Sequence, residues 1–153
     1  MKTHLFHPAA PSDAVQWRSL LTDYSVLLFV FLFGYVAFSK LITFQMFSEQ
    51  LARSPFISGF SGILAWLVPS IEIFICLLMI LPFTRLAGVL IFTIIMMGFT
   101  AYIALMLVFS SNMPCICGGV ISGLSWLQHL IFNAVFVLWG LVLLLFFKKE
   151  LHP

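Results

Sequence analysis

Charged side chains are scarce in this chain of 153 residues, since Asp, Glu, Lys and Arg together make up only 8% of it. Soluble domains average about 25%. Hydrophobic residues account for 63% of the sequence. The formal net charge of +2 comes from so few ionisable groups that it gives no indication of a nucleic-acid partner, and we expect none. The composition predicts an integral membrane protein whose main partner is the lipid bilayer.

Internal repeats, low-complexity segments and the pattern of a cleavable secretory signal are also missing from the sequence. A secretory signal has an apolar core of about 7–15 residues and a small-residue cleavage site. The first apolar run here is longer, from Tyr24 to Ile42, and it follows a polar start. We interpret this run as an uncleaved membrane span and expect residues 1–153 to form a single membrane domain.

Four apolar stretches are long enough to cross a bilayer, which takes about 20 residues in a helix. They are about residues 22–43, 62–82, 85–110 and 122–147. Between the first two, Phe44, Phe47 and Leu51 recur at helical spacing among polar residues, which predicts a short amphipathic interfacial helix at about 44–52. The predicted fold class is therefore an all-α membrane protein, a four-transmembrane-helix up-down bundle with this short helix between helices 1 and 2.

The distribution of Lys and Arg predicts the orientation in the membrane, because cytoplasmic segments carry an excess of these residues. An even number of spans puts both termini on one side. Five basic residues lie on the tails and the connection between spans 2 and 3: Lys2, Arg18, Arg85, Lys148 and Lys149. Only Lys40 and Arg53 lie toward the opposite side. We expect a multi-pass protein of a bacterial inner membrane with both termini cytoplasmic and the connection between spans 3 and 4 periplasmic.

Two of the three cysteines, Cys115 and Cys117, lie one residue apart in that connection, between Pro114 and Gly118-Gly119. Pro and Gly allow the sharp bend that a disulfide between residues i and i+2 requires. A disulfide in so small a ring is strained, and strained, exposed disulfides are the labile or catalytic ones. Because disulfides form and persist in the periplasm, the pair predicts thiol–disulfide exchange with another protein.

Three alternatives to exchange stay open from the residues alone. The pair could form a permanent structural disulfide, although so small a ring restricts the unfolded chain very little. With Met113 it could bind Cu(I), which prefers thiolate and thioether ligands. Because the sequence shows no further ligand cluster nearby, we assign no metal site. The protein could also be a non-catalytic membrane subunit that anchors or stabilises a larger complex.

Ionisable residues inside a membrane span are costly and are candidate functional residues. Glu72 lies roughly 15 Å into the second span, near the middle of the bilayer, where a carboxyl group is either protonated or paired. The available cation is Lys40, whose long stem could reach inward or extend to water. We predict either a structural Lys40 to Glu72 link or a proton-handling role. Cys76, one turn beyond Glu72, is predicted to be a buried free cysteine without a role in the chemistry.

The last span carries a stripe of small and polar residues that predicts a face packed against other helices. They are Ser122, Ser125, His129, Asn133 and Gly140. His129 lies about 10 Å below the outer surface, between the level of the cysteines and that of Glu72. Because disulfide reduction takes up two protons and histidine titrates near neutral pH, His129 and Glu72 are candidates for a proton relay. A plain interhelical hydrogen bond from His129 is the alternative.

Four motifs in order along the chain resemble those of a known family. They are Lys40-Leu41, Phe44-x-x-Phe47-x-x-x-Leu51, Pro69-x-x-Glu72 and Cys115-x-Cys117-Gly118. Over about residues 22–147 the set resembles the MauE branch of the DoxX-like membrane proteins. Gly119 stands where members of that branch carry Phe, a departure that concerns the packing of the loop.

The resemblance implies a four-helix redox-associated membrane protein that works with thioredoxin-fold partners outside the inner membrane. It implies that Cys115 and Cys117 are the redox pair and that Lys40 and Glu72 are the family's intramembrane polar residues. With His129 added from the residue analysis, these five are the candidate catalytic residues of a thiol–disulfide oxidoreductase. The sequence identifies no cofactor. A membrane quinone is the candidate electron carrier, because exchange needs a redox partner in the membrane.

Overall fold

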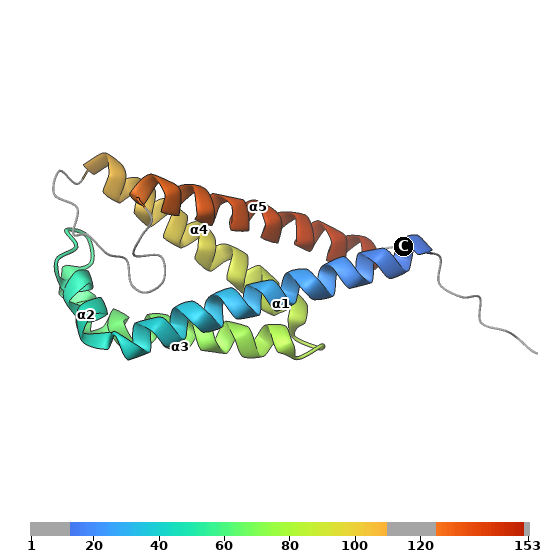
Figure 1. Cartoon of the computed structure of the whole chain (residues 1–153), viewed down its shortest axis with the longest axis horizontal. Helices are drawn as coiled ribbons and strands as arrows, with labels where there is room; N and C mark the ends of the chain where they lie inside the picture. Colours follow the sequence, from blue (N-terminus) through green and yellow to red (C-terminus); the bar gives the residue numbers. More distant parts are fainter. Residues whose placement is uncertain (1–12, 110–124, 152–153) are drawn as a thin grey trace, which may run out of the picture.

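The computed structural model describes residues 13–109 and 125–151, and within them the fold is entirely helical (Figure 1). The elements in chain order are α1 (Asp13–Ile42), α2 (Phe44–Ala52), the 3-10 turn η1 (Ser58–Phe60), α3 (Ser61–Ile80), α4 (Arg85–Phe109) and α5 (Trp126–Leu151). The predicted fold class, four long helices with a short helix between the first two, is confirmed.

The four long helices are apolar and long enough to cross a membrane. The spans are Trp17–Ile42, Ser58–Ile80, Arg85–Phe109 and Trp126–Lys148. The protein is therefore a multi-pass membrane protein. Helix α1 has 30 residues and begins upstream of the start expected near residue 22. At 1.5 Å per residue it is about 45 Å long, which exceeds a hydrocarbon core of roughly 30 Å. Its first turns continue beyond the apolar run because Gln16 and Arg18 are good helix formers.

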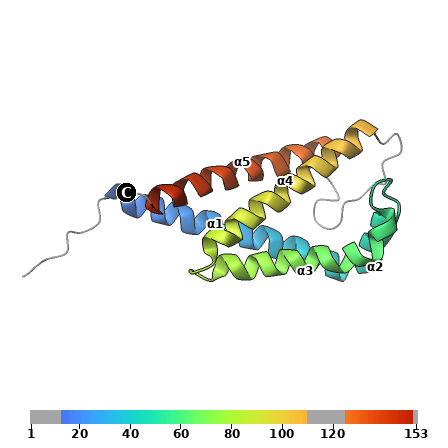
Figure 2. The same ribbon diagram turned by 180° about the vertical axis from the view of Figure 1, so that it is seen from behind.

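The helices pair as α1 with α3 and α4 with α5, and a short turn joins α3 to α4. The beginning of α1 and the end of α5 lie at one end of the bundle, which we call the terminal end, and α2 crosses the other, the α2 end (Figure 1). Seen from both sides, the two helix pairs approach each other toward the terminal end and separate toward the α2 end (Figure 2). The bundle is consequently packed differently in its two halves.

Aromatic rings form the centre of the packed core. The ring of Phe29 on α1 stacks on that of Phe92 on α4, with centroids 4.2 Å apart, and Phe33 lies 4.5 Å from Phe92. Phe136 of α5 and Met79 of α3 belong to the same buried cluster. Lipid tails are as apolar as the helices, so close packing and polar contacts have to hold a membrane bundle together. Each aromatic pair contributes about 0.5–1.5 kcal/mol beyond the area that it buries.

Two glycines allow the helices to approach closely. A Cβ atom on Gly88 of α4 would lie 2.7 Å from Cγ and 2.8 Å from the backbone nitrogen of Met79 on α3. A Cβ on Gly140 of α5 would overlap with the Thr93 hydroxyl of α4. Gly140 and Asn133 are both buried, as the stripe on the last span predicts for a packed face. Small residues thus set the α3 to α4 and α4 to α5 distances.

Helix α2 is amphipathic, as its sequence predicts. Phe47 is buried, and the ring of Phe44 packs on that of Trp66 on α3 with centroids 4.6 Å apart. Gln45 and Glu49 are exposed on the other face. The apolar side of α2 therefore rests on the bundle and covers part of its α2 end (Figure 1).

Candidate functional site

A buried ion pair links α1 to α3. Lys40, in the last turn of α1, donates from Nζ to Oε1 of Glu72, in the middle of α3. The Glu72 side chain is 0% exposed and that of Lys40 is 12% exposed. The stem of Lys40 therefore reaches inward and not to water. The contact proposed from the sequence is present, and it joins the two helices inside the apolar part of the bundle.

Aromatic rings surround the Lys40 ammonium. Nζ lies 5.5 Å from the ring centroid of Phe47 on α2 and 5.3 Å from that of Phe99 on α4. Both distances are within the range of a cation–π interaction, which gains strength where water is excluded. The positive charge is thus held by groups from three helices other than its own, a carboxylate on α3 and rings on α2 and α4.

The two carboxylate oxygens of Glu72 differ in their contacts. Oε2 is buried and has no hydrogen-bond partner in the part of the chain that the structure describes. A buried polar atom left without a partner costs about 1–3 kcal/mol, so native proteins seldom keep one without a reason. Among the described residues, Oε2 is therefore a hydrogen-bond acceptor without a donor.

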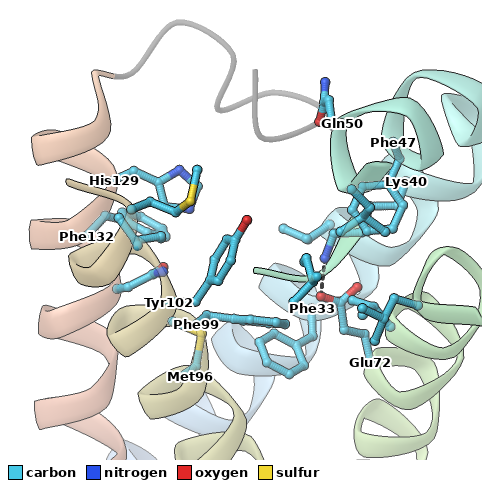
Figure 3. Close-up of a pocket in the computed structure, with 18 of the residues that line it drawn as sticks. Phe33, Lys40, Phe47, Gln50, Glu72, Met96, Phe99, Tyr102, His129 and Phe132 are labelled. Carbon is cyan, nitrogen blue, oxygen red and sulfur yellow. Dashed lines mark hydrogen bonds and ion pairs between the residues drawn. The ribbon is translucent and has the colours of Figure 1, made fainter. Parts of the chain in front are cut away.

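This carboxylate lies in the wall of a cavity of about 300 Å³ at the α2 end of the bundle (Figure 3). Side chains from α1, α2, α3, α4 and α5 line it, and most of them are apolar or aromatic. The polar groups in its walls are Lys40, Gln50, Glu72, Tyr102, His129 and Asn133. The cavity occupies the half of the molecule where the two helix pairs separate.

His129 enters the cavity from the first turn of α5, across from Lys40 and Glu72 (Figure 3). Its side chain is half-buried, and Asn133, one turn further along α5, is buried in the same wall. The structure thus brings together three of the five candidate catalytic residues, Lys40, Glu72 and His129. Because His129 and Glu72 stand on opposite walls, a proton relay between them would have to cross the cavity.

Cys115 and Cys117 lie outside the described residues, as does Met113. The structure does describe the helices on either side of their segment, α4 and α5. Phe109 ends α4 and Ser125 precedes α5, and both lie at the α2 end (Figures 1 and 2). The segment that carries the two thiols therefore starts and finishes at the end of the bundle that contains the cavity.

Cys76 is not among the residues that line the cavity. Cys76 is a buried free cysteine whose Sγ donates to the Val30 carbonyl oxygen at 3.5 Å, which agrees with the structural role expected for it. Among residues 13–109 and 125–151, no group of three His, Cys, Asp or Glu side chains could hold a metal ion. The Cu(I) alternative concerns the segment between α4 and α5.

The aromatic walls of the cavity are not predicted from the sequence. Phe33, Phe99 and Phe132 line it, and the hydroxyl groups of Tyr102 and Ser54 are hydrogen-bonded at 2.9 Å. Phe99 and Tyr102 are three residues apart and so share a face of α4. In a helix that is apolar all round, however, nothing in the spacing distinguishes a face toward a cavity from one toward lipid.

Fold and site together define a small multi-pass helical membrane protein with an ion pair and an aromatic-walled cavity in one half of its bundle. A family model described as methylamine utilisation protein MauE matches residues 18–146. The chain belongs to the MauE family, as its motifs indicate. No curated protein and no solved structure gives a significant match. The match includes all the cavity-lining side chains and the segment with the two thiols.

Proposed function

We propose that this protein is a membrane thiol–disulfide redox protein that exchanges a Cys115–Cys117 disulfide with an extracytoplasmic thioredoxin-like partner. The observation that supports the proposal best is the position of the ionisable groups in the cavity wall. Lys40, Glu72 and His129 gather at the end of the bundle to which the thiol-bearing segment is attached. A bundle that served only as an anchor could use the Lys40 to Glu72 pair to hold two helices together, but it would have no use for a third ionisable group, His129, in the same cavity.

The exchange itself needs only the two sulfurs of each protein. A thiolate of the partner attacks one sulfur of the Cys115–Cys117 disulfide, whose S–S bond breaks as a mixed disulfide forms. The second partner thiol then attacks the mixed disulfide, which leaves the partner oxidised and this pair as two thiols. Two protons move from the partner's thiols to Cys115 and Cys117. The reverse sequence oxidises this pair, and the same groups serve both directions.

The charges of the described residues support termini in the cytoplasm of a bacterium, with the Cys-x-Cys segment in the periplasm. Arg18 and Lys148 lie toward the terminal end, as does Arg85 at the start of α4. At the α2 end, Lys40 is engaged inside the bundle with Glu72, which leaves Arg53 as the exposed cation of the described residues there. The excess of positive charge at the terminal end is the pattern of a cytoplasmic side.

Trapping the mixed disulfide tests the proposal. When this pair, as two thiols, attacks a disulfide of the partner, one of its sulfurs forms the mixed disulfide and the other resolves it. Replacing the resolving one of Cys115 and Cys117 with Ser should therefore make one of the two single variants accumulate a covalent adduct with the partner. The adduct is detected on non-reducing gels of membranes and disappears on reduction. Cys76→Ser is the matched control, because Cys76 is buried between α1 and α3 and should leave the adducts unchanged. Absence of an adduct with both variants would refute exchange.

Sidedness and redox state are tested together by thiol labelling of intact cells with a membrane-impermeant maleimide. Cys115 and Cys117 should label from outside only after mild reduction, since the resting pair is expected to be a disulfide. The double Cys→Ser variant is the control for background. Labelling that requires opening the cells would place the pair in the cytosol and contradict the proposal.

A non-catalytic anchoring subunit is the second candidate. The observation that favours it is the Lys40 to Glu72 pair, which joins α1 to α3 and would stabilise such a subunit. In that case the double Cys115→Ser, Cys117→Ser variant keeps full function in cells. A Cu(I)-handling role instead predicts copper bound to the purified protein and lost with the same substitutions. The trapping experiment separates both from exchange, since neither forms a mixed disulfide.

A further inference from the structure

The Lys40 to Glu72 pair in the cavity at the α2 end takes no part in making or breaking the S–S bonds of the exchange itself. We propose that it binds the ring of a membrane quinone, in both the oxidised and the reduced form, with Lys40 as hydrogen-bond donor and Glu72 Oε2 as acceptor. The choice of a quinone among carbonyl compounds rests on the proposed redox function. The site for a small ring with oxygen substituents is inferred from the Lys40 to Glu72 pair and from the size and aromatic walls of the cavity, without the proposed redox function.

Lys40 can donate to a ligand without giving up Glu72. An ammonium group carries three N–H donors, and Glu72 Oε1 accepts one of them. The side chain of Lys40 is nearly buried, and the neighbouring Phe47 and Phe99 rings hold its charge without accepting a conventional hydrogen bond. A carbonyl oxygen that entered the cavity beside Nζ would therefore meet a charged donor.

Glu72 Oε2 supplies the complementary group. It is fully buried and lacks a donor among the described residues, although it belongs to a side chain that lines the cavity. Because the Glu72 side chain is 0% exposed, a hydroxyl group of a ligand would donate to Oε2 after a small shift of the side chains that cover this atom. A quinone presents carbonyl oxygens, which need donors, and a quinol presents hydroxyl groups, which also need acceptors. The Lys40 to Glu72 pair meets both needs, whereas a lipid acyl chain meets neither.

The size and walls of the cavity suit one substituted ring. Its volume of about 300 Å³ is at the lower end of the range of ligand pockets. Phe33, Phe99 and Phe132 face this space together with Tyr102 (Figure 3). Aromatic side chains favour flat rings through offset stacking and edge contacts. The cavity is partly open, which leaves a way out for a hydrophobic tail.

The redox step balances with the thiols of the proposed function. A quinone takes up two electrons and two protons and becomes a quinol. Oxidation of Cys115 and Cys117 from two thiols to one disulfide releases two electrons and two protons. Two S–H bonds break, one S–S bond forms, and two O–H bonds form on the ring, so no further oxidant or reductant is required.

Binding is tested with the purified full-length protein in detergent, titrated with a benzoquinone that carries a decyl tail. Quenching of tryptophan fluorescence follows binding, because Trp126 lines the cavity. We expect saturable quenching. Val68→Phe, which adds volume to the cavity wall, should raise the Kd at least tenfold. Leu67→Phe is the matched control, since Leu67 is 46% exposed on the outer face of the same helix, and should leave the Kd within twofold.

The role of the ion pair is tested by the neutral double variant Lys40→Met, Glu72→Met, which removes donor and acceptor together without leaving one charge buried. Its Kd for the quinone should also rise at least tenfold. Decylbenzene, which has the tail and the ring but no oxygen, should compete at least tenfold more weakly than the quinone with the unsubstituted protein. Equal competition, or equal effects of Val68→Phe and Leu67→Phe, would show a general apolar site and overturn the proposal.

The double Cys115→Ser, Cys117→Ser variant separates this inference from the proposed function. It should bind the quinone with unchanged Kd, whereas only the dithiol form of the unsubstituted protein should reduce bound quinone, followed by its ultraviolet absorbance. Binding without dithiol-dependent reduction would refute the redox step and leave the site standing. Mixed-disulfide trapping without quinone binding would refute the site and leave exchange standing.

Discussion

Replacing Lys40 with Met should destabilise the protein more than any other single change to the ion pair. Methionine keeps most of the length and volume of the side chain and can still contact Phe47 and Phe99. What it removes is the counter-charge of Glu72. Because Oε2 already lacks a partner among the described residues, the variant leaves the whole carboxylate buried with no donor.

The expected loss follows from the burial of the two side chains. Removing one member of a buried pair costs about 3–5 kcal/mol. Glu72 can limit this loss by taking up a proton, and neutralising an ordinary glutamate at pH 7 costs about 3.7 kcal/mol. We therefore expect Lys40→Met to lower the free energy of unfolding by about 3–4 kcal/mol. Glu72→Gln should cost less, about 1–2 kcal/mol, because Lys40 is 12% exposed and its stem can carry the charge to water.

The double variant Lys40→Met, Glu72→Met gives the decisive comparison. Replacing both members of a buried pair with apolar residues is often neutral or stabilising, so the double variant should be more stable than Lys40→Met alone. The free energy of unfolding is measured in mixed micelles by titration with sodium dodecyl sulfate, followed by tryptophan fluorescence and circular dichroism.

Two results would refute this reasoning about the pair. Equal losses for Lys40→Met and Glu72→Gln would mean that both charges reach water equally well. A loss in the double variant equal to the sum of the single losses would mean that the two side chains do not interact. Either result would also remove the geometric basis of the quinone site.

Two further predictions concern other parts of the bundle. Gly88→Ala should lower the free energy of unfolding by about 1–3 kcal/mol, because the new methyl group would meet the Met79 backbone nitrogen at 2.8 Å. Gly98→Ala, with nothing within 4 Å, should leave it unchanged or raise it by up to about 1 kcal/mol, because Ala favours a helix more than Gly does. Equal effects of the two in the same micelle assay would contradict the close approach of α3 and α4. Arg85→Gln should cost less than about 1 kcal/mol, and less still at high salt, because its partner Asp23 is 53% exposed. A loss as large as that of Lys40→Met would be inconsistent with a solvent-screened pair.

The sequence was sufficient to predict the fold, because membrane spans are long apolar runs that no soluble element imitates. The amphipathic spacing of Phe44, Phe47 and Leu51 predicted α2 equally well. Helix α1 was the exception at its start, since a helix that leaves the hydrocarbon no longer has to be apolar, and hydropathy alone does not detect its polar turns.

The candidate site was predicted only where it contains ionisable groups. Lys40, Glu72 and His129 were identified because each is costly in a membrane. Their meeting in one cavity could not be predicted, because it depends on the angle at which the helix pairs separate. Phe99 and Phe132 were missed for the related reason that an aromatic residue in a membrane helix is compatible with lipid, core and cavity alike.

The Phe29 to Phe92 stack has a consequence for proton traffic. It lies about one turn from Leu32 and Met96, the cavity-lining residues of α1 and α4 nearest the terminal end, and belongs to the buried core. An ion crossing such a layer faces a steep electrostatic barrier. A proton path between this cavity and water is therefore shortest through the α2 end, on one side of the membrane. Under the proposed function, chemistry at this site would then exchange its protons with the periplasm alone.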